Sequence, residues 1–489
     1  MPRKMLRLLR RVLVLLFVVA GALLGLRAWD SQRGPPLDPW HTHVPHDWHA
    51  AEIDKADWAA YLEAEEAAFR EVRTEIVDKI DDEAKTPGNR YYADSPIYPG
   101  NFAQDWNRSY ILEPDGPAVG AVVLLHGLTD SPYSLRHVAR SYRDRGFVAV
   151  AIRMPGHGTV PAALTDIEWE DWDAATRLAV REARRRVGPS RPLHIVGFSN
   201  GGALAVKYAL DAVDDQRLAR PDRLILLSPM IGITAFARFA GIAALPAMFP
   251  AFAKAAWLGI VPEFNPFKYN SFPVNGARQS HRLTVALQDR LATAAQQGKL
   301  DRLPPILTFQ SVADFTVSTR AVISGLYALL PANGSELVLF DINRAAKLGL
   351  LLRSTSETML SRILADPPRN FRTTIVTNAG PDTYEVVKRV TDAGSVDEKV
   401  QPLGLAFPAG LFSLSHVALP FPMNDSLYGM QPDDIDEFGV NLGAIAPRGE
   451  RNVLILNLDA LLRASSNPFH PFLMERIEET MGKPPQAAP

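Results

Sequence analysis

The chain has 489 residues, no cysteine, and 52 basic against 54 acidic side chains. Its length and its 47% of hydrophobic residues are enough for a large buried core, either in two or three domains or in one large domain with insertions. A net charge of −2 argues against a dedicated nucleic-acid binder, and the lack of cysteine excludes disulfides, thiolate metal sites and cysteine nucleophiles.

Residues 1–30 are predicted to be a membrane anchor or an export signal. An apolar run from Val12 to Leu26 follows five cations, which are Arg3, Lys4, Arg7, Arg10 and Arg11. The run is shorter than the ~20 residues that span a bilayer untilted, but snorkelling arginines extend it. Because no small-x-small cleavage site ends the run, we favour an uncleaved anchor over a cleaved signal of a secreted protein. The positive-inside rule then places the rest of the chain on the non-cytoplasmic side, which in a bacterium is the periplasm.

Residues 31–104 are expected to form a linker and an amphipathic helical extension. The stretch 31–50 is rich in proline, histidine and tryptophan, and we interpret it as a linker or surface loop rather than a metal site. Four histidines cluster in it: His41, His43, His46 and His49. Between residues 52 and 83, apolar side chains recur at steps of three and four, with a gap at Glu65 and Glu66. This pattern predicts a helix that packs one face on the main domain.

Residues 105–489 alternate short apolar strands with helical segments. Strands are expected at 108–113, 121–125, 147–152, 193–196, 224–227, 306–310 and 337–340, and helices at 134–144, 172–186 and 202–211. Buried strands separated by helices predict an α/β fold with a mostly parallel sheet that helices cover on both faces.

Two segments are expected to interrupt this α/β pattern. The first is a helical cap at about 230–300, whose apolar first part suits packing on the body, an acyl-binding wall or contact with lipid. Within it, Lys268 and Arg278 are interpreted as solvated side chains rather than contacts for an anionic head group. The second is an insertion at about 344–405, in which 371–377 is predicted to be a strand and 384–390 a strand or short helix.

The segment Gly197-Phe198-Ser199-Asn200-Gly201-Gly202 carries the strongest chemical signal. It follows an apolar strand and opens a helix, which is the context of a nucleophile elbow. The glycines leave room for a sharp turn that raises the Ser199 hydroxyl above the sheet. The helix amino terminus favours negative charge that develops beside it. Ser199 is therefore the predicted nucleophile.

The loop His126-Gly127-Leu128 ends an earlier strand. We expect the backbone N–H groups of Leu128 and Asn200 to form the oxyanion hole. His126 is expected to shape this loop. His157, in the tight loop 155–158, is expected to be structural or to line the pocket.

A serine nucleophile needs a general base, and the base needs an acid that orients it. In this chain order the acid follows the serine and the histidine follows the acid. Asp314 lies just past a buried strand and is preferred over Asp341. The chain after Asp314 holds two histidines, and His416 is preferred as the base because His470 lies between prolines in the tail and is expected at the surface.

These motifs resemble the α/β-hydrolase superfamily, and within it the branch of monoacylglycerol-lipase-like and lysophospholipase-like serine hydrolases. The resemblance covers about residues 105–430 and implies an acyl-enzyme on Ser199, with His416 as general base, Asp314 as acid, and no metal or organic cofactor. Two features depart from the family pattern. Asp314 and His416 are 102 residues apart, where the family usually needs far fewer, and a minimal hydrolase lacks the amino-terminal anchor and helix.

The expected function is hydrolysis of a lipid-like or other apolar acyl ester, with a small-molecule substrate and the membrane as partners and no nucleic acid. Two alternatives stay open. The same triad can act on a thioester or amide or transfer the acyl group to an alcohol, or the chain is a catalytically silent, membrane-tethered binding protein. The sequence does not define the oligomeric state.

Overall fold

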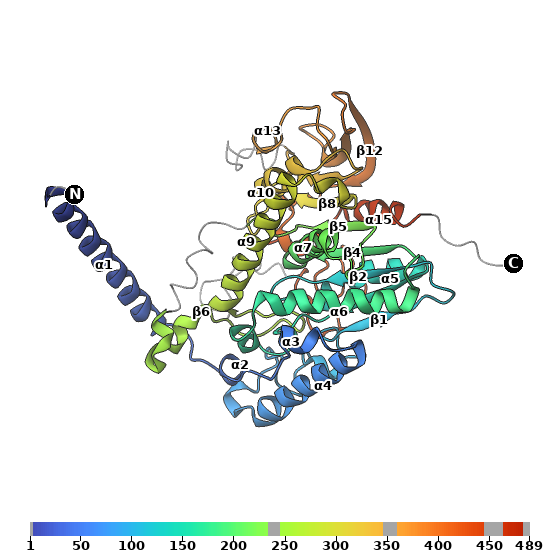
Figure 1. The fold of residues 1–489 in the computed structure, drawn as a ribbon. Coiled ribbons are helices and arrows are strands. Elements are labelled where there is room, and N and C mark those ends of the chain that lie inside the picture. Colours follow the sequence, from blue (N-terminus) through green and yellow to red (C-terminus); the bar gives the residue numbers. More distant parts are fainter. Residues whose placement is uncertain (1–2, 233–244, 346–358, 445–462, 483–489) are drawn as a thin grey trace.

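A computed structural model describes residues 3–232, 245–345, 359–444 and 463–482. Its centre is a ten-stranded sheet in the order β1-β3-β2-β4-β5-β8-β9-β10-β11-β12 (Figure 1). The strands are β1 Tyr110–Leu112, β2 Gly120–Leu125, β3 Phe147–Ile152, β4 Leu193–Phe198, β5 Arg223–Leu227, β8 Ile306–Ser311, β9 Glu336–Phe340, β10 Arg372–Asn378, β11 Glu385–Thr391 and β12 Glu398–Ala406. All pairs from β3 to β10 in this order are parallel, which confirms the predicted fold class.

Helices cover both faces of the sheet, as the apolar strands predict. The main helices are α5 Arg136–Asp144, α6 Trp169–Val187, α7 Asn200–Asp214, α9 Val274–Gln296, α10 Thr319–Gly325 and α15 His470–Glu479. In β2, Val123 and Leu125 join one core cluster with α6, α7 and α9, whereas Val122 and Leu124 join another with α5 and α15. Successive side chains of a strand point to opposite faces, so a strand between two helical layers must be apolar throughout.

Shorter helical segments connect the main elements. They are α13 Met359–Ile363 and the 3₁₀ turns η1 Val77–Lys79, η2 Asp82–Ala84, η3 Pro99–Asn101, η4 Pro132–Leu135, η5 Pro161–Thr165, η7 Leu245–Met248, η8 Pro250–Ala256, η9 Leu300–Arg302, η10 Tyr327–Leu329 and η11 His416–Ala418. The expected helix at 134–144 therefore begins as a 3₁₀ turn.

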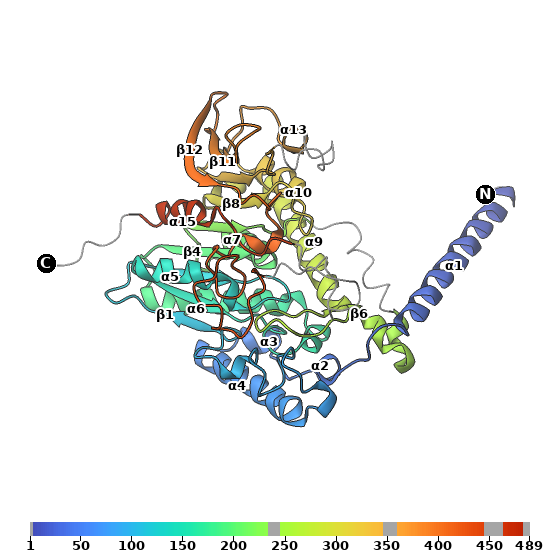
Figure 2. The ribbon, with the colours of Figure 1, turned by 180° about the vertical axis from the view of Figure 1, so that it is seen from behind.

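The insertion after β9 extends the sheet. Strand β10 adds parallel to β9, and β11 and β12 follow as antiparallel neighbours, so the segment 384–390 forms a strand and not a helix (Figure 2). Two reversals leave β12 pointing the same way as β9. The chain therefore leaves β12 at the edge where the parallel strands end, which is the edge that carries Asp314. His416 can thus lie next to Asp314 although the two residues are far apart in sequence. Residues 346–358 of the insertion lie outside the described part.

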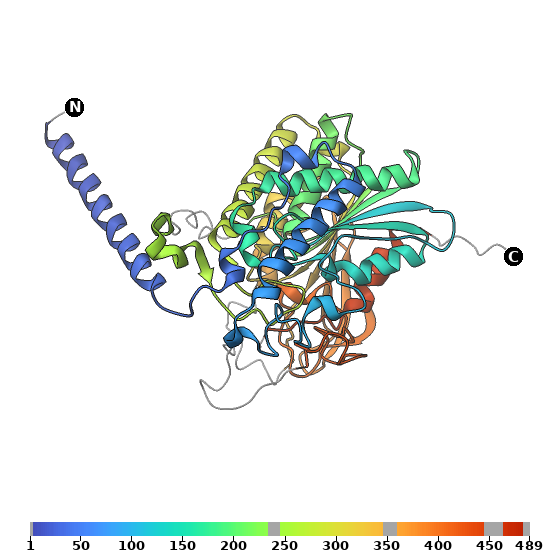
Figure 3. The same ribbon diagram turned by 90° about the horizontal axis from the view of Figure 1, so that it is seen from below.

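The amino-terminal helix α1, Arg3–Ser31, projects away from the body (Figures 1 and 3). Among the described residues, one helix is long and apolar enough to cross a membrane, namely Arg10–Ser31 with a mean hydropathy of 2.3. Near its end, Arg27 donates to the carbonyl of Trp257 and Gln32 to that of Ala251. The helix therefore joins the body at the segment that follows β5.

Residues 32–104 pack closely on the main domain, and the stretch expected as a linker is part of this packing. Its short helices are α2 Pro39–Thr42 and α3 Ala50–Ile53, and α4 Trp58–Glu75 is the predicted amphipathic helix. Arg153, just after β3, is buried and pairs with Asp47 at 2.6 Å and with Glu65 at 3.1 Å. Glu65, which interrupts the apolar stripe of α4, thus belongs to a buried ion pair with Arg153. The spacing of apolar residues cannot reveal such a pair.

The segment between β5 and β8 is only partly a cap. Helix α9 packs on α7, and its Leu283, Leu287 and Leu291 belong to the main core. It is therefore a helix of the body. The preceding part contains η7, η8 and the two-stranded ribbon of β6 Trp257–Gly259 and β7 Phe272–Pro273. Residues 233–244 of the expected cap lie outside the described part.

Candidate active site

Ser199 lies between the end of β4 and the start of α7, at the edge where the parallel strands end. Its φ of 53° and ψ of −114° are strained for a residue with a side chain. A Cβ on Gly202 would lie 2.6 Å from the Cβ of Pro229, and one on Gly197 would lie 2.7 Å from the Cα of Gly202. The turn therefore requires glycine on both sides of the serine.

The two predicted oxyanion donors flank this turn. Asn200 is the first residue of α7, so its N–H has no partner within the helix. Leu128 follows Gly127, where an added Cβ would lie 3.3 Å from the Cβ of Ser199. The structure records no acceptor for either N–H in the described part of the chain. Both amides are thus available near the serine.

His416 and Asp314 are paired. The imidazole Nδ1 lies 2.9 Å from Asp314 Oδ2, and the Asp314 side chain is fully buried. Burial alone would raise the pKa of Asp314, but the hydrogen bond and charge of His416, together with the N–H groups of Val317 and Thr316, hold it below its usual value. The acid is therefore ionised at neutral pH.

Phe198, which directly precedes Ser199, contacts His416. Its ring stacks on the His416 imidazole with centroids 5.3 Å apart and an interplanar angle of 25°. Ser311 also holds the return loop, because its hydroxyl donates to the Leu414 carbonyl at 2.9 Å. Within the described residues the structure records no hydrogen bond between the Ser199 hydroxyl and His416. Such bonds often form only when substrate is bound.

The structure separates the other candidates from His416. Asp341 accepts from Arg344 at 2.8 Å and from Thr377 at 2.9 Å. His470 is 7% exposed, so the expectation that it lies at the surface is wrong. It starts α15, which packs against α5, and burial lowers its pKa to about 3.

The two upstream histidines have structural surroundings. His126 Nε2 accepts from the Met154 N–H at 3.0 Å, and Nδ1 therefore donates to the Gly127 carbonyl at 2.9 Å. This bond fixes the loop that carries Leu128, which confirms the predicted shaping role. His157 is buried and bonds the Pro155 carbonyl at 3.0 Å, and burial lowers its pKa to about 4.

The four histidines between residues 41 and 49 do not point to one common site. His41 bonds Ser271, His43 contacts Glu71 and His49 bonds Asp171. The described ranges contain no group of three or more His, Asp or Glu side chains that could hold a metal ion. The stretch is a packing element.

Gln310 is a site residue that sequence reasoning missed. Its Nε2 donates to Asp314 Oδ2 at 3.1 Å and to Thr319 at 3.1 Å. The available signal was a large polar side chain near the end of the buried strand β8, four residues before the acid. Such a residue must find a buried partner.

A cavity of about 320 Å³ adjoins the candidate site. We call it the Lys268 cavity. Its lining includes Asp130, Phe198, Lys268, Val417, Tyr428 and Arg463. Lys268 is only partly exposed and faces this cavity, so the expectation of a solvated surface lysine is wrong. The Tyr269 N–H donates to the Thr129 carbonyl and Arg90 donates to the Asn265 carbonyl, so the loop from Asn265 to Asn270 lies between the loop that carries Leu128 and the amino-terminal extension.

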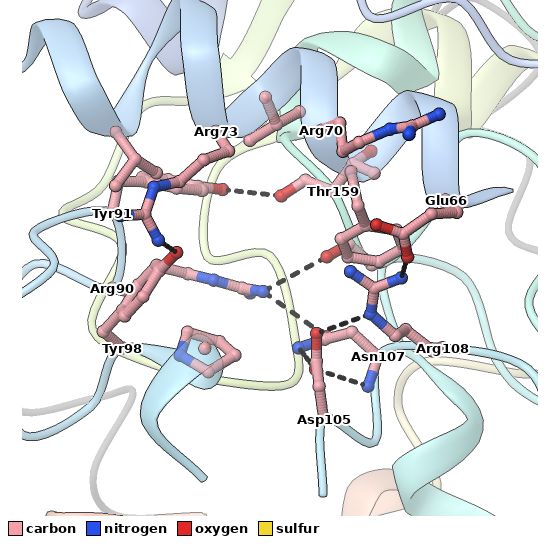
Figure 4. A pocket seen from close by; sticks show the side chains of 16 residues that line it. Glu66, Arg70, Arg73, Arg90, Tyr91, Tyr98, Asp105, Asn107, Arg108 and Thr159 are labelled. Carbon is pink, nitrogen blue, oxygen red and sulfur yellow. Dashed lines mark hydrogen bonds and ion pairs between the residues drawn. The ribbon is translucent and has the colours of Figure 1, made fainter.

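A second cavity, of about 270 Å³, lies between α4 and the segment that leads to β1 (Figure 4). Arg90 crosses it and donates to Asn107 and to the Gly158 carbonyl, while Arg108 pairs with Glu66. None of the triad candidates lines this cavity. Its arginines mainly fasten the amino-terminal extension to the body.

The chain is similar to several known proteins. A thermostable monoacylglycerol lipase from Bacillus sp. (strain H-257) is 30% identical over 95 residues, which cover 19% of this chain and 36% of the relative. The chain therefore matches about a third of that relative's length. A structure reported for the metagenome-derived lipolytic enzymes LipS and LipT has a TM-score of 0.38 at 21% identity, over 53% of this chain and 97% of the other. A soluble variant of monoglyceride lipase from Saccharomyces cerevisiae has a TM-score of 0.35 at 15% identity, over 47% and 81%.

The family profile described as the alpha/beta hydrolase family matches residues 122–380, more than half of the chain. This match spans β2 to β10 and therefore includes the elbow and Asp314. The family resemblance that the motifs indicate is thus confirmed, and the chain belongs to the alpha/beta hydrolase family.

Proposed function

We propose that this protein is a serine ester hydrolase that cleaves a lipid-like acyl ester, with Ser199, His416 and Asp314 as its triad. One observation carries the proposal: the buried bond between His416 Nδ1 and Asp314 Oδ2 lies beside a serine on a strained strand-to-helix turn. Membership of the alpha/beta hydrolase family and the similarity to a monoacylglycerol lipase support it.

The mechanism follows from the roles of these groups. The Ser199 hydroxyl attacks the ester carbonyl while His416 Nε2 takes its proton, and Asp314 stabilises the imidazolium that forms. The N–H groups of Leu128 and Asn200 bind the developing oxyanion, each contributing about 3 kcal/mol by analogy with measured sites. His416 then protonates the departing alcohol. Water, activated by the same histidine, hydrolyses the acyl-enzyme.

We also propose that α1 is an uncleaved anchor that holds the enzyme at a bilayer, with the catalytic domain on the non-cytoplasmic side. Next to the end of α1, Met248 is 78% exposed and Phe249 is 64% exposed. Elements η7 and η8 contact α1 in the structure. The position of these two side chains favours their insertion into the bilayer surface beside the anchor.

Hydrolysis of p-nitrophenyl esters of increasing chain length tests the activity, using protein without residues 1–30. We expect the wild-type chain to turn these esters over and Ser199→Ala to lose at least about 10³-fold in kcat. Labelling by a fluorophosphonate is measured on the same samples and should vanish in Ser199→Ala. A folded wild-type protein that neither reacts with the probe nor cleaves any ester would refute the proposal and favour a silent binding protein.

A further inference from the structure

Arg90 is a buried cation that no carboxylate contacts in the described part of the chain. The buried arginines of that part are Arg90, Arg136 and Arg153. Arg153 pairs with two carboxylates and Arg136 with one, whereas Arg90 donates to neutral oxygens alone. A buried charge costs much solvation free energy unless a counter-ion pairs with it. Arg90 is therefore the buried cation whose counter-ion the described residues do not supply.

The Arg90 guanidinium also keeps one free donor. Its Nη1 donates to the carbonyls of Asn265 at 3.1 Å and Lys268 at 3.5 Å. Its Nη2 donates to the side-chain oxygen of Asn107 and to the Gly158 carbonyl, both at 3.4 Å. Three of these contacts are longer than the usual range of about 2.7–3.2 Å. The Nε–H is buried and has no acceptor among the described residues.

The acid near Arg90 is already bound by other groups. The charge of Arg90 lowers the pKa of the Glu263 carboxyl group, but burial raises that pKa overall. The Glu263 carboxylate accepts from the backbone N–H groups of Asn270 at 3.0 Å and Ser271 at 2.8 Å. In the ranges that the structure covers, no hydrogen bond or ion pair joins this carboxylate to the Arg90 guanidinium.

The Arg90 side chain crosses the cavity of about 270 Å³ between α4 and the segment that leads to β1, which we call the Arg90 cavity (Figure 4). Its lining contains four arginines, which are Arg70, Arg73, Arg90 and Arg108. It contains two carboxylates, Glu66 and Asp105, and Arg108 contacts them at 2.5 and 3.4 Å. The carboxylates of the lining are thus engaged by an arginine other than Arg90.

The rest of the lining is mainly apolar or aromatic. It includes Phe69, Val72, Val77, Tyr91, Tyr98 and Pro99. The Tyr91 hydroxyl donates to the Thr159 carbonyl at 3.2 Å, and the Tyr98 hydroxyl accepts from Arg73 at 3.1 Å, so both rings are held in place. The volume of the cavity corresponds to about nine water molecules at ~30 Å³ each. Such a space suits an anion that carries an apolar body of this size.

We propose that the Arg90 cavity binds a small organic carboxylate, which pairs with the Arg90 guanidinium and places its apolar body against Phe69 and Tyr91. A carboxylate carries one charge, which balances the one buried cation, and a guanidinium forms strong charge-assisted bonds with its oxygens. None of the triad candidates lines this cavity. The inference therefore goes beyond the proposed function and does not depend on it.

The site joins two parts of the protein. Arg90 and α4 belong to the amino-terminal extension, whereas Asn107, Gly158 and Thr159 belong to the main domain. A ligand that binds only where these parts meet stabilises the folded protein by mass action. The carboxylate should therefore raise Tm as its concentration increases.

Isothermal titration of the full-length chain in a non-ionic detergent with benzoate tests the proposal, and benzamide is the neutral analogue. We expect benzoate to bind at one site and benzamide to bind at least tenfold more weakly. Arg90→Met should weaken benzoate binding at least tenfold, the effect of a lost hydrogen bond to a charged group. The matched control is Arg278→Met, since Arg278 is an exposed cation on α9 outside the cavity, and its affinity should stay within about twofold of the wild type.

A second variant keeps Arg90 and closes the cavity. Val72→Phe places a larger side chain in the space from α4, so it should also weaken benzoate binding at least tenfold. It tests the site independently of the folding of Arg90→Met. Saturating benzoate should raise Tm of the wild type and of Arg278→Met, and leave Tm of Val72→Phe unchanged.

Lys268→Met distinguishes this site from the candidate active site. It removes the cation of the Lys268 cavity and should leave the affinity for benzoate within about threefold. A loss in Lys268→Met as large as that in Arg90→Met would place the anion next to the triad and overturn the inference.

Four further results would contradict the proposal. They are the absence of benzoate binding to the wild type at millimolar concentration, equal affinities for benzoate and benzamide, unchanged affinity in folded Arg90→Met or Val72→Phe, and binding of phenyl phosphate as tight as that of benzoate. The last result would overturn the assignment of the ligand as a carboxylate. Hydrolysis of p-nitrophenyl esters is measured separately, so none of these results bears on the proposed function.

Discussion

The Asp314 carboxylate has a hydrogen-bond donor for each of its lone-pair directions. Oδ2 accepts from His416 and Gln310, and Oδ1 accepts from the N–H groups of Thr316 and Val317. An ionised carboxylate that is fixed in this way keeps the proton of the imidazole on Nδ1. Nε2 is then free to accept the proton of the Ser199 hydroxyl.

We therefore expect Asp314→Asn to lower kcat for p-nitrophenyl butyrate about 10³- to 10⁴-fold, because an amide in this position stabilises the wrong imidazole tautomer. The matched control is Asp341→Asn, a second buried aspartate that follows the neighbouring strand and bonds Arg344 and Thr377. It should lower Tm and leave kcat within about threefold. Equal kcat in Asp314→Asn and the wild type would contradict the assignment of the acid.

At the scale of elements, the amino-terminal extension is fastened to the sheet by Arg153. Its guanidinium is buried and contacts Asp47 from the stretch before α3 and Glu65 from α4. The Asp47 carboxylate also accepts from the Gly156 N–H at 2.8 Å. One arginine thus joins the extension to the loop after β3, close to the oxyanion loop.

Arg153→Met should lower the free energy of unfolding by about 3–5 kcal/mol, because it leaves two buried carboxylates without their cation. The control is Arg108→Met, since Arg108 pairs with Glu66 at the surface and a surface pair contributes at most about 1 kcal/mol. Urea unfolding of protein without residues 1–30 measures both values. Similar losses in the two variants would show that the buried network does not hold the extension.

The elements that could be predicted from the sequence are those whose signal is local. Strands such as β2 and β4 are apolar throughout because both faces are covered, and the elbow is a short motif. Strand β12 is mostly exposed at the sheet edge, so it has no apolar pattern to read. The prolines beside His470 suggested a surface turn, whereas one of them occupies the first turn of α15.

For the candidate site the same distinction holds. Ser199, Asp314 and His416 follow from the order of motifs along the chain. The surroundings of Lys268, which include Asp130 and Arg463, come from segments that only the folded chain brings together. A sequence-based prediction of a side chain's role therefore fails where that role depends on contacts with residues that are distant in sequence.

At the scale of the whole molecule, α1 and the segment of η7 and η8 share one end of the protein (Figure 3). This segment carries the exposed pair Met248 and Phe249. Protein without residues 1–30 should still bind phosphatidylglycerol vesicles weakly, since two apolar side chains remain to enter the bilayer surface. Serine at both positions should reduce this binding at least fivefold in a vesicle sedimentation assay. Serine in place of Val396 and Val400, which are exposed on the β11–β12 hairpin, should leave it unchanged. An equal effect of the two double substitutions would refute the membrane role of the pair.

The stability of the whole molecule should fall as the pH decreases below about 6.5. Burial lowers the pKa of His41, His137 and His157 to about 4, and that of His194 and His470 to about 3. Between these values and the pKa of about 6.5 in the unfolded chain, each histidine is neutral when folded and protonated when unfolded. The unfolded state then binds more protons, so acid favours unfolding.

Each such histidine contributes a slope of up to about 1.4 kcal/mol per pH unit in that window and none above it. His470→Gln should therefore reduce the slope of unfolding free energy between pH 6 and pH 5 by about one such contribution. His46→Gln is the matched control, because it makes the same substitution at an exposed position and removes no buried imidazole. Urea unfolding at pH 7.5, 6 and 5 measures the slopes. An unfolding free energy that is constant from pH 7.5 to pH 5 would contradict the burial of neutral histidines in this fold.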